Sequence, residues 1–521
     1  MKKTHKRISA AVLSLALGFS VAGAPALAPM ASAQSINAGQ ASSVNLGADV
    51  SLTINKYDGE IDDTTTPLGG ADFTVAKVDL NGENLNTVDG WTVVNNIQAA
   101  LDAGTTPDLA GDAWELTTDS TGTVTISTGT TNDNVDGSDT ANFTVGLYLV
   151  TEKQNGNFSV GKPFLVALPF TNGDGEWGYQ QTVEPKNQLL SVEKDVSDLG
   201  TTLNMPVNYT INASVPAEEL DRFNIIDALP AELDLGTDTA ITVTVINTTP
   251  SVTLVETTDY SIDPTEFSND TIKIEFTETG LEKLETARVT NPNLQIQVTF
   301  TATIVELPED GVIRNDVVVE LPNGGSITTD PEDPDDPDTG AETRLGTLTI
   351  NKRDVNGALI EIEGDVTRGA SFELWRCEEI TSDTWEVSEG PLSAAIENEQ
   401  GDLINVNEFT TATNGVALLE GVQIRDWVNN GAPAESEVDP DLCVVETIAP
   451  TGYVLNPAPQ PVNVDSSDEF IMTADVINLE DTIDGQLPST GGMGTMAMIA
   501  GGLLVAVAGG FAALRGNRAR G

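Results

Sequence analysis

The pentapeptide LTINK occurs twice in this chain of 521 residues, at residues 52–56 and again at residues 348–352. Each copy is followed by the pattern Gly-Ala-x-Phe, at residues 70–73 and at residues 369–372. A repeated unit of this size indicates duplicated domains. The two halves of the chain therefore carry copies of the same fold.

The composition indicates which fold is repeated. Aromatic residues make up 5% of the chain, and Gly, Asp, Thr and Val are abundant. Few long helical periods are present, so we predict many short strands with polar turns, packed as β-sandwiches. Roughly 450 mature residues exceed what one core usually organises, so about three domains are expected.

A second motif lies near the end of the later copy. Residues 442–453 read LCVVETIAPTGY, which resembles the E-box of CnaB-type immunoglobulin-like domains that form an internal Lys-Asn isopeptide bond. The resemblance implies that Lys352 is the nucleophile, Glu446 the catalytic acid and Asn478 the acceptor. Burial favours the neutral amine and keeps the glutamate protonated, as this reaction needs. The alternative is a Lys352–Glu446 salt bridge at a sheet edge.

The earlier copy carries the same residues with a shorter motif. Lys56 precedes Glu152 by 96 positions, against 94 between the corresponding residues of the later copy, and Asn187 follows 35 positions further on. The resemblance implies a Lys56–Asn187 bond with Glu152 as the acid. The Ala-Pro-x-Gly-Tyr continuation is missing, which predicts slow or incomplete formation.

The segment between the copies resembles a CnaA-type domain. It contains VEKDV at residues 192–196, FNIID at 223–227 and IRN at 313–315. The resemblance implies that Lys194 attacks Asn315 with Asp227 as the acid. The alternative for residues 227–230 is a simple turn.

A further lysine lies beside Asn187. Residues 177–186 read WGYQQTVEPK, which resembles the WxxxVxVYPK motif of sortase-assembled major pilins, with Gln181 and Glu184 as departures. Neighbouring side chains on a strand point to opposite faces, so a buried Asn187 predicts an outward Lys186. The resemblance implies that Lys186 accepts the next subunit; the alternative is an ordinary solvated lysine.

The two ends of the chain indicate export and anchoring. Basic residues and an apolar stretch precede Ala31-Ser32-Ala33, which predicts a signal peptide at 1–33. Near the other end, 22 uncharged residues from Met493 to Leu514 precede three arginines, which predicts a membrane-spanning helix. The peptide before this helix resembles a sortase sorting signal cut between Thr490 and Gly491, and consists of Leu487, Pro488, Ser489, Thr490 and Gly491. The alternative is an uncleaved anchor.

The composition also excludes several functions. The sole histidine, His5, lies in the signal peptide, which removes Ser-His-Asp and Cys-His catalysis and histidine metal sites from the mature chain. A net charge of -56 argues against nucleic-acid binding. No cofactor is expected. Asp333, Asp335 and Asp336 are a weak candidate for a Ca²⁺ site. The prolines of the same stretch favour a solvated, extended linker instead.

Cys377 and Cys443 are the only cysteines. Export favours oxidation, so we predict a disulfide between them, with two buried thiols as the alternative.

These observations predict an all-β chain of three tandem immunoglobulin-like sandwiches. The expected segments are the signal peptide 1–33, a CnaB-like domain 34–190, a CnaA-like domain 191–329, an acidic Pro-rich linker 330–345, a CnaB-like domain 346–482, and the sorting signal, membrane helix and basic tail 487–521.

The resemblance to sortase-assembled pilins implies a major shaft subunit at the cell surface. Thr490 would be linked to Lys186 of the next identical subunit in a head-to-tail fibre, a heterologous contact that repeats without closing. The implied partners are pilus-specific and housekeeping sortases, minor tip and base pilins, and peptidoglycan. The alternative is a monomeric wall-anchored adhesin that binds a host ligand. An enzyme is not expected.

Overall fold

The computed structural model describes residues 36–60, 63–130, 142–171, 176–236, 239–262, 270–330, 340–362, 369–381, 384–398, 400–424, 429, 431, 441–465 and 468–481. The predicted signal peptide, the sorting signal with its helix, and the acidic residues Asp333, Asp335 and Asp336 lie outside these ranges. Within the described ranges, no helix is both long and apolar enough to cross a membrane.

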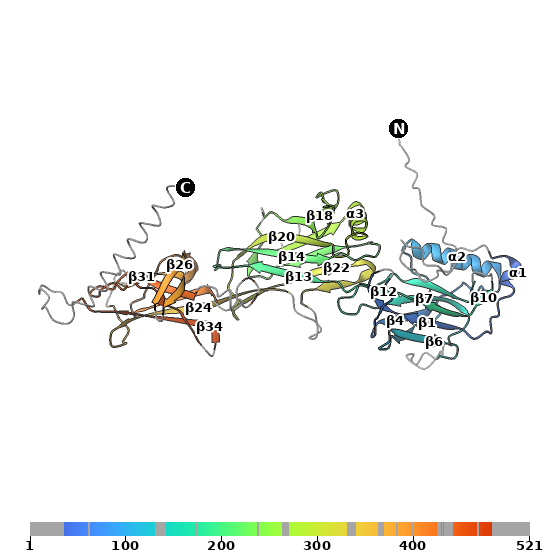
Figure 1. The fold of residues 1–521 in the computed structure, drawn as a ribbon, viewed down its shortest axis with the longest axis horizontal. Coiled ribbons are helices and arrows are strands. Elements are labelled where there is room, and N and C mark those ends of the chain that lie inside the picture. Colours follow the sequence, from blue (N-terminus) through green and yellow to red (C-terminus); the bar gives the residue numbers. More distant parts are fainter. Residues whose placement is uncertain are drawn as a thin grey trace, which may run out of the picture.

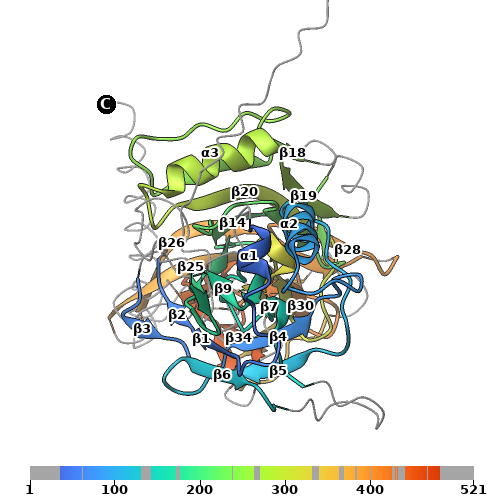
Figure 2. The ribbon, with the colours of Figure 1, turned by 90° about the vertical axis from the view of Figure 1, so that its right-hand side faces the viewer.

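Three hydrophobic cores follow one another along an extended row of β-sheets (Figure 1). The first core comprises buried residues from Ile36 to Val183, the middle core mainly residues from Leu190 to Leu345, and the third core residues from Leu348 to Val476. Figure 2 views the row from the end that carries the first core. The predicted all-β class with tandem sandwiches is confirmed.

The first core is built from two main sheets. Strand β1 (Ser51–Asn55) contains the first LTINK copy and alternates, so that Leu52 and Ile54 are buried. It pairs parallel with β11 (Gln180–Val183) and antiparallel with β6 (Thr123–Ser127). The second sheet has the order β5 (Trp114–Thr117), β4 (Asp72–Lys77), β7 (Gly146–Glu152), β8 (Phe164–Leu168). Short pairs complete the unit: β2 (Tyr57–Asp58), β3 (Thr66–Pro67), β9 (Phe170–Thr171), β10 (Trp177–Gly178) and β12 (Lys186–Asn187).

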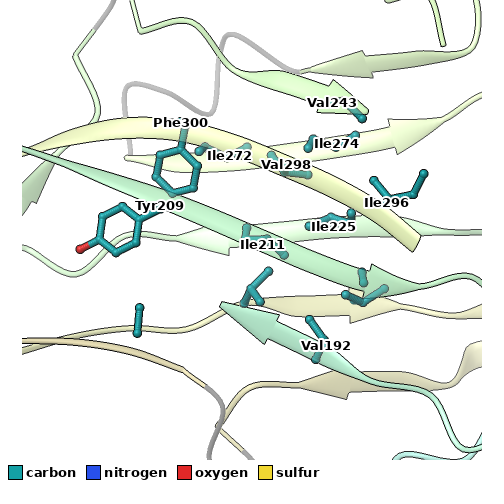
Figure 3. Packing of buried hydrophobic residues seen from close by; sticks show 14 of the residues in the cluster. Val192, Tyr209, Ile211, Ile225, Val243, Ile272, Ile274, Ile296, Val298 and Phe300 are labelled. Carbon is teal, nitrogen blue, oxygen red and sulfur yellow. The ribbon is translucent and has the colours of Figure 1, made fainter. Parts of the chain in front are cut away.

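The middle core lies between two five-stranded sheets. One contains β13 (Val192–Ser197), β14 (Pro206–Ser214), β16 (Leu233–Asp234), β17 (Thr242–Ile246) and β20 (Gln295–Ile304). The other contains β15 (Asn224–Ala228), β18 (Tyr260–Ile262), β19 (Thr271–Phe276), β22 (Val318–Glu320) and β23 (Ser326–Thr328). Figure 3 shows their aliphatic side chains meeting between the sheets, beside the stacked rings of Tyr209 and Phe300, whose centroids are 5.2 Å apart.

The third core repeats the two-sheet plan. One sheet contains β24 (Ala341–Asp354), β27 (Ala394–Glu397), β28 (Leu403–Val406), β30 (Val416–Gln423), β33 (Asn463–Asp465) and β34 (Asp468–Asn478). The other contains β25 (Ser371–Thr381), β26 (Thr384–Leu392), β29 (Phe409–Thr410), β31 (Asp441–Ile448) and β32 (Gln460–Pro461). Strand β24 carries the second LTINK copy and runs parallel to β34.

Strand β24 also joins the middle core to the third. Its first residues, 341–344, pair antiparallel with β21 (Val312–Asn315), and its later residues pair with β30 and β34. The strands pack closely where β24 changes partners. A Cβ atom at Gly346 would lie only 2.4 Å from the carbonyl oxygen of Phe470, so this position requires glycine. Residues 341–345, which we predicted to be linker, are therefore strand, since their backbone groups and the buried Ala341 and Leu345 complete the middle unit.

Among the described residues, three α-helices interrupt the strands, and none of them was predicted from the sequence. They are α1 (Ala38–Ala41), α2 (Val88–Asp102) and α3 (Glu278–Arg288); one 3₁₀ turn, η2 (Pro322–Gly324), is also present. Helices α2 and α3 begin at threonine caps, where Thr87 and Thr277 accept hydrogen bonds from backbone N–H groups three residues later. Helix α2 buries Trp91 and Val94, a helical spacing.

Candidate functional site: three buried lysine groups

Each core holds one buried lysine beside a buried carboxyl group. In the first core, Lys56 directly follows β1, Glu152 ends β7 in the facing sheet, and Asn187 lies on β12, which runs parallel to β2. The topology therefore brings together three residues that are up to 131 positions apart in the sequence. We call Lys56, Glu152 and Asn187 the first triad.

The first triad is fully hydrogen-bonded within itself. The amine of Lys56 donates to Glu152 Oε2 at 2.9 Å and to Asn187 Oδ1, and Asn187 Nδ2 donates to Glu152 Oε1 at 2.6 Å. Lys56 is 0% exposed, and burial lowers its pKa and raises that of Glu152. Both shifts favour the neutral pair, an amine and a carboxylic acid.

The third core contains the matching third triad. Lys352 lies on β24, Asn478 on the adjacent parallel strand β34, and Glu446 on β31 in the opposite sheet. Lys352 Nζ lies 2.6 Å from Asn478 Oδ1 and 3.3 Å from Glu446 Oε1, and Asn478 Nδ2 donates to both Glu446 oxygens at 2.9 Å. Burial lowers the pKa of Lys352 to about 8. The pair is buried, so it is not a salt bridge at an exposed sheet edge.

The middle core brings Lys194 on β13 to Asp227 on β15, in the facing sheet. Their charged atoms are 2.5 Å apart, and both side chains are 0% exposed. Lys194 Nζ also donates to the backbone carbonyl of Asp316, the residue after Asn315, at 3.1 Å. Burial lowers the pKa of Lys194 to about 8 and raises that of Asp227.

The side chain of Asn315 is buried in the same core. It is 1% exposed, and neither of its polar atoms completes a hydrogen bond of ordinary geometry, although the side chain interacts with the phenol of Tyr209. A buried polar group left in this way costs about 1–3 kcal/mol. The residues Lys194, Asp227 and Asn315 form the middle triad, whose amide is less well satisfied than those of the other two.

Aromatic rings flank all three lysines, and the sequence analysis assigned them no role. The amine of Lys56 lies 5.7 Å from the ring centroid of Phe73, that of Lys352 lies 6.0 Å from Phe372, and that of Lys194 lies 5.3 Å from Tyr209. The first two rings are the phenylalanines of the repeated Gly-Ala-x-Phe patterns. The repeated phenylalanine was the sequence signal from which this contact could have been predicted. A ring over the amine excludes water from the site.

Lys186 lies just outside the first triad. Its strand β12 pairs parallel with β2, so that Asn187 is buried while Lys186 is partly exposed. Lys186 Nζ donates to the Glu184 carbonyl at 3.2 Å and lies 5.9 Å from the ring centroid of Tyr57. The amine is accordingly held at the surface, one residue from a buried amide.

The tryptophan of the WGYQQTVEPK motif anchors this region. Trp177 stacks on Trp91 of α2, with ring centroids 5.2 Å apart, and its indole N–H donates to Ser43 Oγ at 3.0 Å. Gln181 occupies a buried position on β11, and its Oε1 has no hydrogen-bond partner. The motif therefore contributes to the first core as well as carrying Lys186.

Cys377 and Cys443 form the predicted disulfide. They lie on the neighbouring strands β25 and β31, with Cα atoms 5.9 Å apart, and Cys443 lies three residues before the acid Glu446. Among the described residues, no cluster of three His, Cys, Asp or Glu side chains could hold a metal ion. The weak Ca²⁺ candidate lies outside the described residues.

Known proteins share both the sequence and the fold. Residues 37–188 match the family described as Gram-positive pilin subunit D1, N-terminal domain. The chain is 28% identical to fimbrial subunit type 2 of Actinomyces naeslundii, with 92% of each chain covered. It is also 28% identical to fimbrial subunit type 1 of Actinomyces viscosus, with 84% of this chain and 83% of that protein covered.

Two solved structures have the same architecture. The full-length major pilin SpaD from Corynebacterium diphtheriae superposes with a TM-score of 0.57 at 22% identity, covering 84% of this chain and 100% of that one. The major pilin SpaA from the same organism gives a TM-score of 0.53 at 23% identity, covering 83% and 100%. The chain shares the multi-domain fold of these two pilins. Its residues 37–188 are similar to the Gram-positive pilin D1 domain, and the chain is a homologue of the Actinomyces fimbrial subunits.

Proposed function

We propose that this chain is the shaft subunit of a covalent surface pilus, locked internally by Lys-Asn isopeptide bonds and joined to its neighbours through Lys186 and Thr490. The observation that carries the proposal is the set of buried lysine triads, one in each core. Three isolated salt bridges would be a costly way to stabilise three sandwiches, because burying both charges offsets much of their attraction. The burial of these residues is explained if they are the reactants of an isopeptide bond.

The internal reaction needs only the residues of each triad. In the third triad, the neutral amine of Lys352 attacks Asn478 Cγ while Glu446, which lies against the amide nitrogen, carries a proton from the amine to the leaving group. A Cγ–Nζ bond forms, the Cγ–Nδ2 bond breaks, and one ammonia leaves after receiving that proton through Glu446. Burial favours the neutral amine and the fold supplies the proximity of the three groups, so no separate enzyme is required. The first and middle triads follow the same scheme with Glu152 and Asp227.

The proposed link between subunits joins Thr490 of one subunit to Lys186 in the first unit of the next. A sortase thiol cleaves the Thr490–Gly491 bond and holds the Thr490 carbonyl as a thioester. The Lys186 amine of the next subunit attacks that carbonyl, forms an amide and releases the thiol. The same chemistry with a peptidoglycan amine would anchor the finished fibre to the wall, and minor pilins would occupy its ends.

A substitution of the proposed acceptor tests the fibre. In cells that carry the pilus sortase, we expect K186A to abolish the ladder of denaturant-resistant multimers. K153A is the matched control, because Lys153 is a half-exposed lysine of the same unit that pairs with Glu115. A ladder that persists in K186A contradicts the assignment, and a wild-type chain that stays monomeric favours the anchored adhesin.

The intact mass of the purified chain tests the internal bonds. We expect the loss of one ammonia for each completed triad, and peptide mapping to place each cross-link at its lysine and asparagine. A mass that matches the uncross-linked sequence, apart from the disulfide, would refute the proposed chemistry.

A further inference from the structure

The first and middle cores meet at a junction of specific polar contacts. Arg288 Nη2 lies 2.8 Å from Glu60 Oε1, and its Nε donates to the Val215 carbonyl at 2.8 Å. Lys162 pairs with Glu219 at 3.0 Å. The segment 215–219 of the middle unit is thereby held against the first unit.

This junction lies directly beside the first triad. The backbone N–H of Ala217 donates to Gln188 Oε1 at 2.8 Å, and Gln188 follows Asn187. On the other side, the N–H of Gly161 lies 3.4 Å from Glu152 Oε2, and Gly161 precedes the Lys162 that pairs with Glu219. Asn187 is therefore adjacent in the chain to a residue that contacts the middle unit, and Glu152 contacts Gly161, the neighbour of a second such residue.

Glu218 lies between these two contacts and has no part in the chemistry proposed so far. Its Oε1 is buried and has no hydrogen-bond partner, although the Ala217 backbone before it and the Glu219 side chain after it both contact the first unit. A buried carboxyl oxygen without a partner costs about 1–3 kcal/mol. A junction that served only for packing would gain stability from an apolar or amide side chain at this position.

We infer that Glu218 is a third ionisable group beside Lys56 and Glu152 of the first triad, supplied by the middle unit, and that it promotes the Lys56–Asn187 bond by favouring the proton on Glu152. This inference rests on the isopeptide chemistry proposed above. It makes docking of the middle unit a condition for fast bond formation in the first. Glu218 is a positioning residue in this scheme, because it acts through Glu152.

The electrostatics support this direction. Burial raises the pKa of Glu218 to about 8, and its charge interacts more strongly with Glu152 than with Lys56. An ionised Glu218 therefore favours moving the proton from the Lys56 ammonium to the Glu152 carboxylate, which is the step that produces the nucleophile. The other charges acting on Glu218 are Asp221, which raises its pKa, and Lys162, which lowers it.

The test compares the rate of bond formation in four forms of the full-length chain: wild type, E218Q, E218D and E219Q. Each chain is kept unfolded in urea after synthesis and refolded by dilution into buffers between about pH 6 and pH 9. The Lys56–Asn187 and Lys352–Asn478 cross-linked peptides are quantified by mass spectrometry over time. E219Q is the matched control, since it removes a neighbouring charge and breaks only the exposed Lys162–Glu219 pair, which contributes little to docking because both side chains are largely solvated.

We expect E218Q to slow formation of the Lys56–Asn187 cross-link about tenfold at the upper end of this range, the factor that corresponds to one pKa unit. It should also remove the change in rate near pH 8, which E218D should restore. The Lys352–Asn478 cross-link should form at the wild-type rate in all forms and reports correct folding.

Equal rates for E218Q and E219Q at every pH would overturn the role of Glu218. If E218Q fails to fold, E218D must show both wild-type folding and the pH-dependent rate, or the inference is wrong. A wild-type chain that forms the Lys352 cross-link but never the Lys56 cross-link would refute both the first bond and this inference, while leaving the third bond intact.

Discussion

Replacing Glu446 by Gln should leave the third core folded but without its cross-link. The substitution keeps the size of the side chain and removes the acid that contacts both Lys352 and Asn478. The bond would join residues 126 positions apart, and the disulfide already closes 66 positions within that loop. A closed loop of the remaining size contributes about 4 kcal/mol by restricting the unfolded chain.

The loss of this contribution should lower the melting temperature of the third unit on the order of 15 °C. Differential scanning calorimetry of the purified chain measures this shift, and the intact mass, once corrected for the Glu-to-Gln substitution, should be one ammonia greater than that of wild type. Glu408→Gln is the control, because Glu408 is exposed and accepts a hydrogen bond from Thr447, the neighbour of Glu446 on β31. An E446Q chain that has still lost the ammonia would refute the role of the acid, and a missing bond with an unchanged melting temperature would refute the loop-closure argument.

Two further changes test other parts of the structure. Gln181→Val should stabilise the first unit by about 1–2 kcal/mol, because it removes a buried Oε1 without a partner; equilibrium denaturation measures this, and a destabilised variant would show that the amide has an unrecognised role. Asn478→Ala leaves Lys352 unreacted, with its folded-state pKa lowered from 10.5 to about 8. Between these two values the folded state binds fewer protons than the unfolded state. The free energy of unfolding of the third unit should therefore increase as pH rises through that window. A flat stability profile over the same pH range would indicate that the Lys352 amine is solvated.

The third triad shows how far the sequence could lead. The E-box and the LTINK repeat identified Lys352, Glu446 and Asn478, and the structure places the three side chains in contact. The first triad was predicted from the first LTINK copy and the matching spacing of Glu152 and Asn187, although its E-box is incomplete. The disulfide was predicted from export and is confirmed. In these cases the relevant signal lies within a few residues of each reacting group.

Features that depend on packing between distant segments could not be predicted in this way. In the sequence, nothing distinguishes Glu218 from any other glutamate of an acidic chain. Its position beside the first triad follows only from the packing of the middle unit on the first. The same is true of β24, whose early residues follow a run of prolines and acids that indicates a linker. In helix α2 a signal was present, since Thr87 and the spacing of Trp91 and Val94 are typical of a capped amphipathic helix.

The strand shared by the middle and third units has a consequence for the order in which the exported chain matures. In the described part of the chain, β21, which carries Asn315, pairs only with the first residues of β24. A chain that emerges from the membrane with its amino end first exposes Asn315 well before residues 341–344. The acceptor strand β21 of the middle unit therefore stays unpaired until the first residues of β24 have emerged. Secretion with the amino end first would therefore set the order in which the proposed cross-links become possible.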